Sequence, residues 1–395
     1  MRFRHPDGSI VHLAYCTNVH PAEDLDGVVD QLGRFAEPIR EKLGADRLGL
    51  GLWLARDVAA VLTTGAPHKT GAVRRLRTAL DRRGLEVVTL NGFPYRGFHA
   101  PVVKHAVYRP DWTEPARLAY TADVAQVLAG LLPDDVAQGS VSSLPLAWRE
   151  PWSNDRRRAA AEHLGELTAR LAKIHADTGR MIRVGFEPEP GCVIDTTDDA
   201  VRELAGVDTE WLGVCLDVCH LAVAFEEPRA ALARLAAAAL PIVKAQASCA
   251  LEAADPADSP TRAALSAAAE QRFLHQVRER APGGVRAADD LDEALHGARA
   301  LPAAGPWRVH FHVPVDTERL GPLGTTRPML VETLRALFGG PRALTRHVEV
   351  ETYTWSVLPS GARAGDRRDL IAGIAAELAW TRDQLRALGL EEVPS

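Results

Sequence analysis

The sequence contains few cysteines, methionines and aromatic residues. Five cysteines and three methionines occur in 395 residues, and aromatic side chains make up 6% of the chain. An odd number of cysteines excludes a framework in which every cysteine is paired, as in small secreted domains. Most of the five lie in or beside apolar runs, so we expect reduced core thiols at Cys16, Cys192, Cys215, Cys219 and Cys249.

Long hydrophobic runs and an excess of positive charge are also missing. No apolar run approaches the roughly eighteen residues that a membrane-spanning helix needs, and residues 1–8 contain no apolar signal region. The formal net charge of −6 gives no indication of a nucleic-acid partner. We therefore expect a cytoplasmic protein without membrane insertion and without a nucleic-acid partner.

The chain alternates short apolar runs with long Ala-, Leu- and Arg-rich segments of helical period. Its 395 residues suffice for two ordinary domains or for one large α/β barrel. Repeated β-then-α units favour a parallel sheet wrapped by helices, and the lack of a GxGxxG turn favours a closed barrel over a doubly wound sheet. The sequence therefore predicts an α/β fold, a single (β/α)8 TIM-barrel domain over residues 1–395.

The number of strand-like runs does not match eight barrel positions. Seven runs lie before residue 248, and Trp307–Val315 and His347–Tyr353 raise the number of candidates to nine. Residues 252–306 are Ala-rich and acidic, and we expect a mostly helical insertion there. One candidate is then an edge piece or part of this insertion, and the sequence leaves open which. A final amphipathic helix is expected over residues 366–388.

Polar side chains that can bind metals stand where several apolar runs end. The run Leu212–Leu216 ends at Asp217, and His220 follows three residues later. In a TIM barrel the carboxyl ends of the strands face one shared mouth, so such side chains meet there. Because strand side chains alternate, the second member of His310/His312 and of Glu349/Glu351 lies nearer the mouth.

Several buried carboxylates in one mouth would repel one another and raise one another's pKa, and a divalent cation removes that cost. The candidates combine carboxylates with imidazoles and include no thiolate, which suits manganese, magnesium, cobalt or zinc. The predicted ligands of this divalent metal ion are Glu187, Asp217, Gln246, His312 and Glu351.

Further residues near the strand ends are candidates for substrate contacts. The segment Asn91–Tyr95 follows the third run and could bring an amide and an aromatic wall to the mouth, although a plain turn explains it equally well. The predicted substrate contacts are Asn91, Tyr95, His99, Glu189, His310 and Trp355.

With these residues assembled, the chain resembles the xylose isomerase-like TIM-barrel superfamily, which includes sugar isomerases, ketose 3-epimerases, hydroxypyruvate isomerase and endonuclease IV. Its pattern is a Glu ending one strand, Asp-x-x-His ending the next, a later His and a final Glu. The matching positions here are Glu187, Asp217 with His220, Gln246 or His312, and Glu351. Epimerases usually carry the third ligand, a His, on the strand after Asp-x-x-His. This chain has Gln246 there, so the third ligand stays open.

Over nearly its full length the sequence is also similar to the metabolite-traffic EboE family. The stretches that carry this second resemblance include Asn91-Gly-Phe-Pro-Tyr95, Val309-His-Phe-His-Val-Pro314 and Val348-Glu-Val-Glu-Thr-Tyr-Thr-Trp355.

The resemblance implies a metal-dependent isomerase or epimerase that removes a proton next to a carbonyl of a small polyhydroxylated metabolite. Glu187 and Glu351 would act as base and acid, and His220 would orient a substrate oxygen or serve as a further ligand. The alternative is a non-catalytic protein that binds a metabolite and passes it to other proteins of an ebo-type biosynthetic cluster. A second copy of the chain is a further expected partner. A nuclease similar to endonuclease IV is disfavoured by the net acidic charge.

Overall fold

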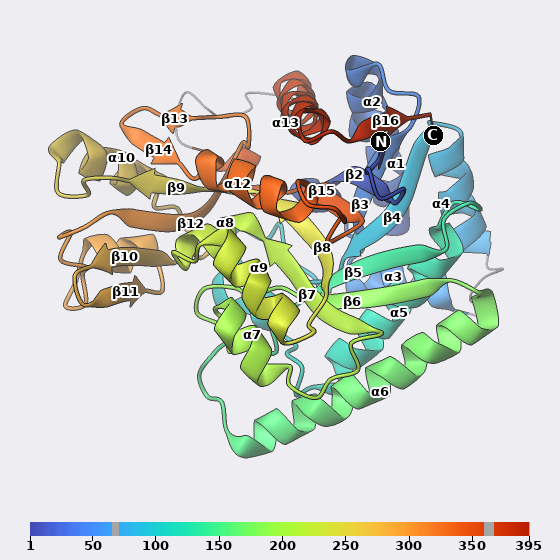
Figure 1. Ribbon diagram of the computed structural model, residues 1–395, viewed down its shortest axis with the longest axis horizontal. Coiled ribbons are helices and arrows are strands. Elements are labelled where there is room, and N and C mark those ends of the chain that lie inside the picture. Colours follow the sequence, from blue (N-terminus) through green and yellow to red (C-terminus); the bar gives the residue numbers. More distant parts are fainter. Residues whose placement is uncertain (65–70, 359–366, 395) are drawn as a thin grey trace.

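Eight parallel strands form a closed barrel in the computed structural model, which describes residues 1–64, 71–358 and 367–394 (Figure 1). Each strand pairs with the next, and the last strand pairs with both β8 and β2, so the sheet closes on itself. The strands are β2 (Ile10–Cys16), β3 (Leu48–Trp53), β4 (Leu85–Asn91), β5 (Gln138–Ser143), β6 (Met181–Phe186), β7 (Leu212–Asp217), β8 (Ile242–Ala247) and β15 (His347–Val350). The predicted (β/α)8 barrel is confirmed.

Helices surround the barrel (Figure 1). They are α1 (Leu25–Gln31), η2 (Leu32–Ala36), α2 (Glu37–Leu43), α3 (Arg56–Thr63), α4 (Gly71–Asp81), α5 (Pro115–Leu131), α6 (Asn154–Thr178), α7 (Thr197–Glu203), α8 (Val218–Val223), α9 (Pro228–Ala237), α12 (Arg327–Phe338) and α13 (Arg367–Ala387). The expected C-terminal helix is α13, and its predicted first residue, Asp366, lies outside the described residues. Helix α5 is apolar nearly all round because it packs against α3, α6 and β4, whereas α6 exposes a charged face.

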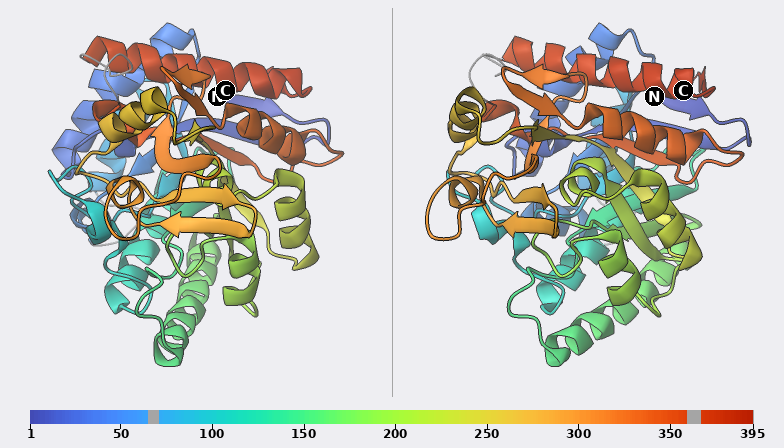
Figure 2. Two further views of the ribbon diagram at one scale, coloured as in Figure 1. Left: turned by 90° about the vertical axis from the view of Figure 1, so that its left-hand side faces the viewer. Right: turned by 60° about the vertical axis from the view of Figure 1, so that its left-hand side comes forward.

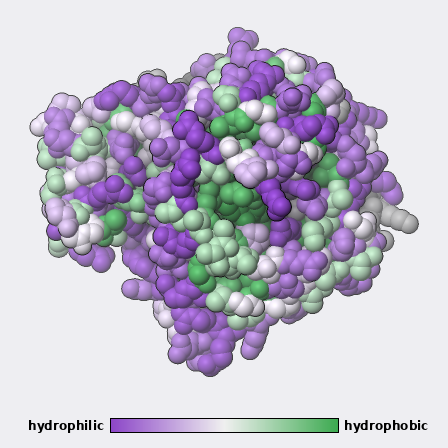
Figure 3. Space-filling view, in the orientation of Figure 1, coloured by the Kyte–Doolittle hydropathy of each residue, from purple (hydrophilic) through white to green (hydrophobic). Residues whose placement is uncertain are grey.

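Two short strands join the chain termini at the barrel wall. β1 (Arg2–Arg4) pairs antiparallel with both β2 and β16 (Glu391–Val393), so the first and last residues lie close together (Figure 1). No helix in the described part of the chain is long and apolar enough to cross a membrane. Hydrophilic residues cover most of the face seen in Figure 3, with a hydrophobic patch near its centre.

A second sheet lies beside the barrel; it identifies the strand candidate that is not in the barrel and corrects the prediction of a mostly helical insertion (Figures 1 and 2). The ninth strand candidate is β12 (Trp307–Val313), which pairs antiparallel with β9 and β10 and is not a barrel strand. The insertion is not mostly helical, because strands form its frame. Its elements are β9 (Cys249–Ala253), α10 (Ser259–Ala268), β10 (Val277–Ala281), β11 (Gly284–Ala288), α11 (Leu291–Leu295), β12, β13 (Arg319–Leu320) and β14 (Leu323–Thr325).

This insertion contains a β-hairpin, although its high alanine content favours helices. Residues 277–281 form β10 although three of them in a row are charged, and Pro282 and Gly283 form the loop before β11. A two-residue loop containing glycine is a strong hairpin signal, and it outweighs the helix propensity of neighbouring alanines. The consequence for function is that His310 and His312 reach the barrel from an added sheet.

Inside the barrel, a buried ion pair lies beneath the mouth. Lys244 on β8 contacts the Glu349 carboxylate on β15, and both side chains are fully buried. Gly51 on β3 makes room for Glu349, since a Cβ atom at Gly51 would lie 1.3 Å from Glu349 Oε1.

Candidate active site

A cavity lies at the carboxyl ends of the barrel strands, between the barrel and the second sheet. Its polar lining consists of Asn18, Asn91, Lys104, Glu187, Glu189, His220, His310, His312 and Glu351. Aromatic and aliphatic side chains complete the wall, among them Phe93, Phe98, Tyr108, Phe273, Leu274 and Tyr353. Three 3₁₀ turns, η1 (Thr17–Val19), η3 (Lys104–Tyr108) and η4 (Tyr353–Ser356), supply part of this lining.

Asp217 ends β7 and caps the N-terminus of α8. Its Oδ1 accepts hydrogen bonds from the backbone N–H of His220 and from the hydroxyl of Ser248, both at 2.9 Å. Its Oδ2 is buried and has no hydrogen-bond partner among the described residues. The Asp-x-x-His spacing is therefore a helix cap that fixes one oxygen and leaves the other available to a cation.

Glu187 directly follows β6, and its backbone N–H donates to the carbonyl of Ser143 at 3.0 Å. Its side-chain Oε2 is buried without a hydrogen-bond partner in the part of the chain that the structure describes. Burial raises the pKa of Glu187 well above its usual range, and the charges of Glu351 and Asp217 raise it further. One oxygen from each of these three carboxylates lies within 4.8 Å of the other two.

Three side-chain amides point at the carboxylate of Glu351. Asn18 and Asn91 donate to its Oε1 at 2.7 and 3.0 Å, and Gln246 donates to its Oε2. Amide N–H groups only donate, so this arrangement fits an ionised carboxylate. Burial and the charges of Glu349 and Asp217 nevertheless raise the pKa of Glu351 well above its usual range. A bound cation explains how the buried carboxylate can be ionised in spite of its raised pKa, because the cation stabilises the ionised form that the amides require.

Gln246 is engaged at both ends of its amide. Its Oε1 accepts the thiol hydrogen of Cys215 at 3.0 Å, while its Nε2 donates to Glu351. In this arrangement Gln246 orients Glu351, and its one amide oxygen faces the Cys215 thiol. An imidazole lies nearby on β12, since one ring nitrogen of His312 lies within 4.8 Å of ligand atoms of Asp217 and His220.

His312 is held as a neutral ring with one free nitrogen. Its Nδ1 lies 2.8 Å from the backbone carbonyl of Glu351 and so carries the hydrogen of that bond. Its Nε2 is buried and unpaired within residues 1–64, 71–358 and 367–394. Burial lowers the pKa of His312 to about 4, so the ring stays neutral near pH 7.

The residues present fit a divalent cation. Buried polar atoms are normally hydrogen-bonded, yet Glu187 Oε2, Asp217 Oδ2 and His312 Nε2 have no partner among the described residues. Two carboxylate oxygens and a neutral imidazole nitrogen are all electron-pair donors, which is the donor chemistry that divalent cations bind.

The structure brings some predicted substrate contacts to this cavity and places others behind it. Asn91, Glu189 and His310 line the cavity. Tyr95 instead packs against Tyr120, with ring centroids 5.1 Å apart. His99 Nε2 lies 2.7 Å from the Asn18 carbonyl, and the indole N–H of Trp355 donates to Glu377 at 3.1 Å, so both support the wall from outside the cavity.

Two further contacts position side chains of this cavity. Asn18 donates a hydrogen bond to Glu351. Its position in the sequence is informative, because it lies two residues after the end of β2, near a strand end as the other candidates do. Tyr108 donates to Glu189 at 2.6 Å and accepts from Gln276 at 2.9 Å. That contact joins residues far apart in the chain, and no local pattern marks it.

Comparison with known proteins places this geometry in a family. Residues 41–259, more than half of the chain, match the family of xylose isomerase-like TIM barrels. None of the curated proteins matches the sequence.

Solved structures are similar to this chain at low sequence identity. A xylose isomerase-like TIM barrel protein from Mycobacterium smegmatis, solved in complex with magnesium, is 12% identical with a TM-score of 0.51, over 95% of this chain and 98% of that one. D-psicose 3-epimerase from Clostridium cellulolyticum H10, solved with D-tagatose, is 14% identical with a TM-score of 0.49, over 95% and 99%. A xylose isomerase domain protein from Planctomyces limnophilus is 12% identical with a TM-score of 0.48, over 96% and 97%. On the extent of the family match, the chain belongs to the xylose isomerase-like TIM-barrel family.

Proposed function

We propose that this protein is a metal-dependent isomerase or epimerase of a small polyhydroxylated metabolite. The observation that carries the proposal is the convergence of three buried carboxylates, Glu187, Asp217 and Glu351, with unpaired donor atoms at the mouth of the barrel. Glu187, Asp217 and Glu351 would hold the cation, and His312 lies next to them. A bound divalent cation would offset the negative charge that develops on a substrate oxygen when a neighbouring proton leaves.

Glu187 is the residue that we propose as the base. It lines the cavity, and its Oε2 has no hydrogen-bond partner among the described residues, so the carboxylate can accept a proton when a bound cation keeps it ionised. Glu351 faces the same cavity from the other side of the site, where Asn18 and Asn91 fix its orientation, and it would return the proton. His220 would orient a substrate oxygen, since its ring lines the cavity and its Nδ1 is held 2.9 Å from the Pro188 carbonyl.

The cavity wall supports a substrate with one apolar face. Phe98, Phe273 and Tyr353 form a cluster with ring centroids 4.9 to 5.3 Å apart. Aromatic rings favour contact with C–H surfaces, so a hydroxylated substrate would direct its oxygens to the carboxylates and its carbon face to this cluster. The EboE resemblance, the cytoplasmic location and association with a second copy or with other proteins of a cluster stay predictions.

Deuterium exchange tests the proposed reaction. The protein is incubated with manganese or magnesium in heavy water with a panel of ketoses, including derivatives with an aliphatic or aryl substituent, and carbon-bound deuterium is measured by NMR. We expect exchange with at least one substrate. We also expect a loss of about a hundredfold or more in Glu187→Gln but not in Glu162→Gln, which alters an exposed glutamate of α6. Absence of exchange across the panel, with metal and ligand both bound, would contradict catalysis and favour the binding alternative.

A further inference from the structure

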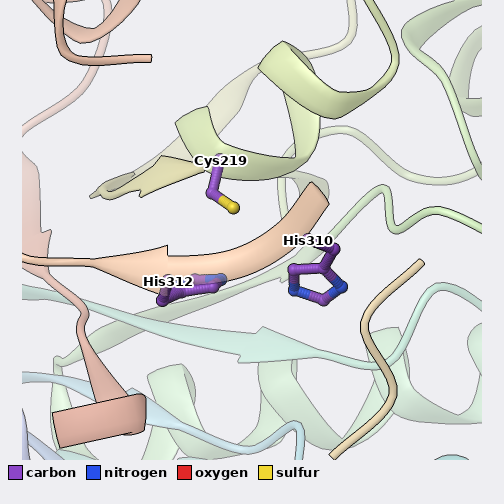
Figure 4. A group of neighbouring side chains, drawn as sticks. All are labelled: Cys219, His310 and His312. Carbon is purple, nitrogen blue, oxygen red and sulfur yellow. The ribbon is translucent and has the colours of Figure 1, made fainter. Parts of the chain in front are cut away.

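A cysteine and two histidines form a second group of donor atoms next to the carboxylates. Cys219 lies on α8, and His310 and His312 lie two residues apart on β12 (Figure 4). One ligand atom of each lies within 4.8 Å of the other two, and all three side chains are buried. In Figure 4 the Cys219 sulfur points towards β12, and the nitrogen end of the His312 ring points towards His310.

The hydrogen bonds of Gln276 define the protonation of His310. Gln276 Nε2 donates to the Pro190 carbonyl at 2.8 Å and to Tyr108 at 2.9 Å. The other end of the amide is therefore its oxygen, and it accepts from His310 Nδ1 at 2.6 Å. With the hydrogen on Nδ1, the neutral His310 ring has its free electron pair on Nε2. His312 has the same arrangement, with Nδ1 bound to a carbonyl and Nε2 unpaired among the described residues.

His220 adds an independent reason to expect positive charge at this position. Its Nδ1 faces the Pro188 carbonyl at 2.9 Å, which again leaves the electron pair on Nε2. That atom lies 3.0 Å from His310 Nε2. Two neutral rings would then direct electron pairs at each other, and a cation bound to His310 Nε2 relieves this repulsion because it takes up one of the two electron pairs.

We propose that Cys219, His310 and His312 form a second cation site, selective for a soft divalent ion of the zinc class. Histidines that bind metals usually donate their other N–H to a carbonyl or carboxylate, and both rings here do so. A sulfur and two imidazole nitrogens suit zinc, whereas the three neighbouring carboxylates suit manganese or magnesium. Because His312 has one free electron pair, it can bind only one ion, and we assign it to the ion of this second site. Binding displaces the Cys219 thiol proton to solvent.

Such an ion would connect the two sheets of the molecule. Cys219 belongs to the helix that follows barrel strand β7, whereas both histidines belong to the added sheet. His310 and His312 also line the cavity, so a fourth coordination position would face the substrate. The site therefore links the position of the insertion to the contents of the cavity.

Cobalt substitution tests the site independently of the proposed reaction. In the cobalt-loaded full chain we expect a thiolate-to-cobalt charge-transfer absorption that is lost in Cys219→Ser and retained in Cys249→Ser, which alters a buried cysteine outside the group. His310→Gln should weaken zinc binding at least about tenfold. Manganese bound at the carboxylates, followed by electron paramagnetic resonance, should persist in Cys219→Ser and shows that the variant is folded.

Two results would overturn the proposal. One is the absence of a thiolate band from the cobalt-loaded wild-type protein. The other is equal loss of the band in Cys219→Ser and Cys249→Ser. Neither result bears on manganese binding by the three carboxylates, so failure of this site and failure of the proposed function are distinguishable.

Discussion

The buried pair of Lys244 and Glu349 gives the most quantitative prediction. Both side chains are fully buried inside the barrel, and Glu349 Oε1 has no hydrogen-bond partner among the described residues. Burial lowers the pKa of Lys244, but the charge of Glu349 outweighs it and keeps that pKa above its usual value, so the lysine is charged. Lys244→Met keeps the alkyl chain and leaves Glu349 as an uncompensated buried charge.

Removing one partner of a buried pair costs about 3–5 kcal/mol, whereas replacing both by apolar residues is close to neutral. We therefore expect Lys244→Met to lower the free energy of unfolding by about 4 kcal/mol, roughly a thousandfold in the folding equilibrium. The double variant Lys244→Met/Glu349→Met should recover most of the lost free energy of unfolding. Urea unfolding followed by circular dichroism, in the presence of a chelator, measures both. A loss of less than about 1 kcal/mol in the single variant, or a double variant no more stable than the single one, would contradict an energetically coupled buried ion pair.

Three further predictions concern the site and its surroundings. Asn91→Ala removes a hydrogen bond to Glu351 and should weaken manganese binding about 10–100-fold by calorimetry; unchanged affinity would contradict the role given to the amides. Manganese at 100 times its dissociation constant should raise the free energy of unfolding by about 2.7 kcal/mol, measured by urea unfolding. The gain should vanish with a chelator or in Asp217→Asn, and persistence in that variant would place the ion elsewhere. Burial raises the pKa of Glu377 from 4.5 to about 7, so the folded state binds a proton that the unfolded state releases. The stability that this group contributes is therefore complete below pH 4.5 and is lost as the pH rises through 7, a decrease of about 3 kcal/mol in the free energy of unfolding. A free energy of unfolding that does not change over this pH range, and that Glu377→Gln leaves unaltered, would contradict this prediction.

The barrel and the centre of its site were predictable because their signals are local. Apolar runs of strand length, each followed by a helical segment, define parallel strands that are buried on both faces. Glu187, Asp217 and Glu351 stand where such runs end, and parallel strands bring their carboxyl ends to one edge. That rule alone brings together residues as distant in sequence as 187 and 351.

The added sheet was not predictable in the same way. The apolar run of β12 has the same period as a barrel strand, and only its partners, β9 and β10, reveal that it is antiparallel. The sequence therefore left the third ligand open between Gln246 and His312, because the answer depends on which sheet contains β12. The contact of Asn18 with Glu351 spans 333 residues, and no periodicity encodes it. Unpaired atoms such as Glu187 Oε2 are recognised only when all neighbours are known.

Anomalous diffraction from manganese-soaked crystals shows directly whether the three buried carboxylates bind a metal ion. We expect a manganese peak at the barrel mouth, within bonding distance of carboxylate oxygens from Glu187, Asp217 and Glu351. The same peak should be absent from crystals of Asp217→Asn. A fully soaked wild-type crystal with no peak among these three residues, or with manganese bound only elsewhere, would contradict the claim that this cluster of buried acids is a metal site.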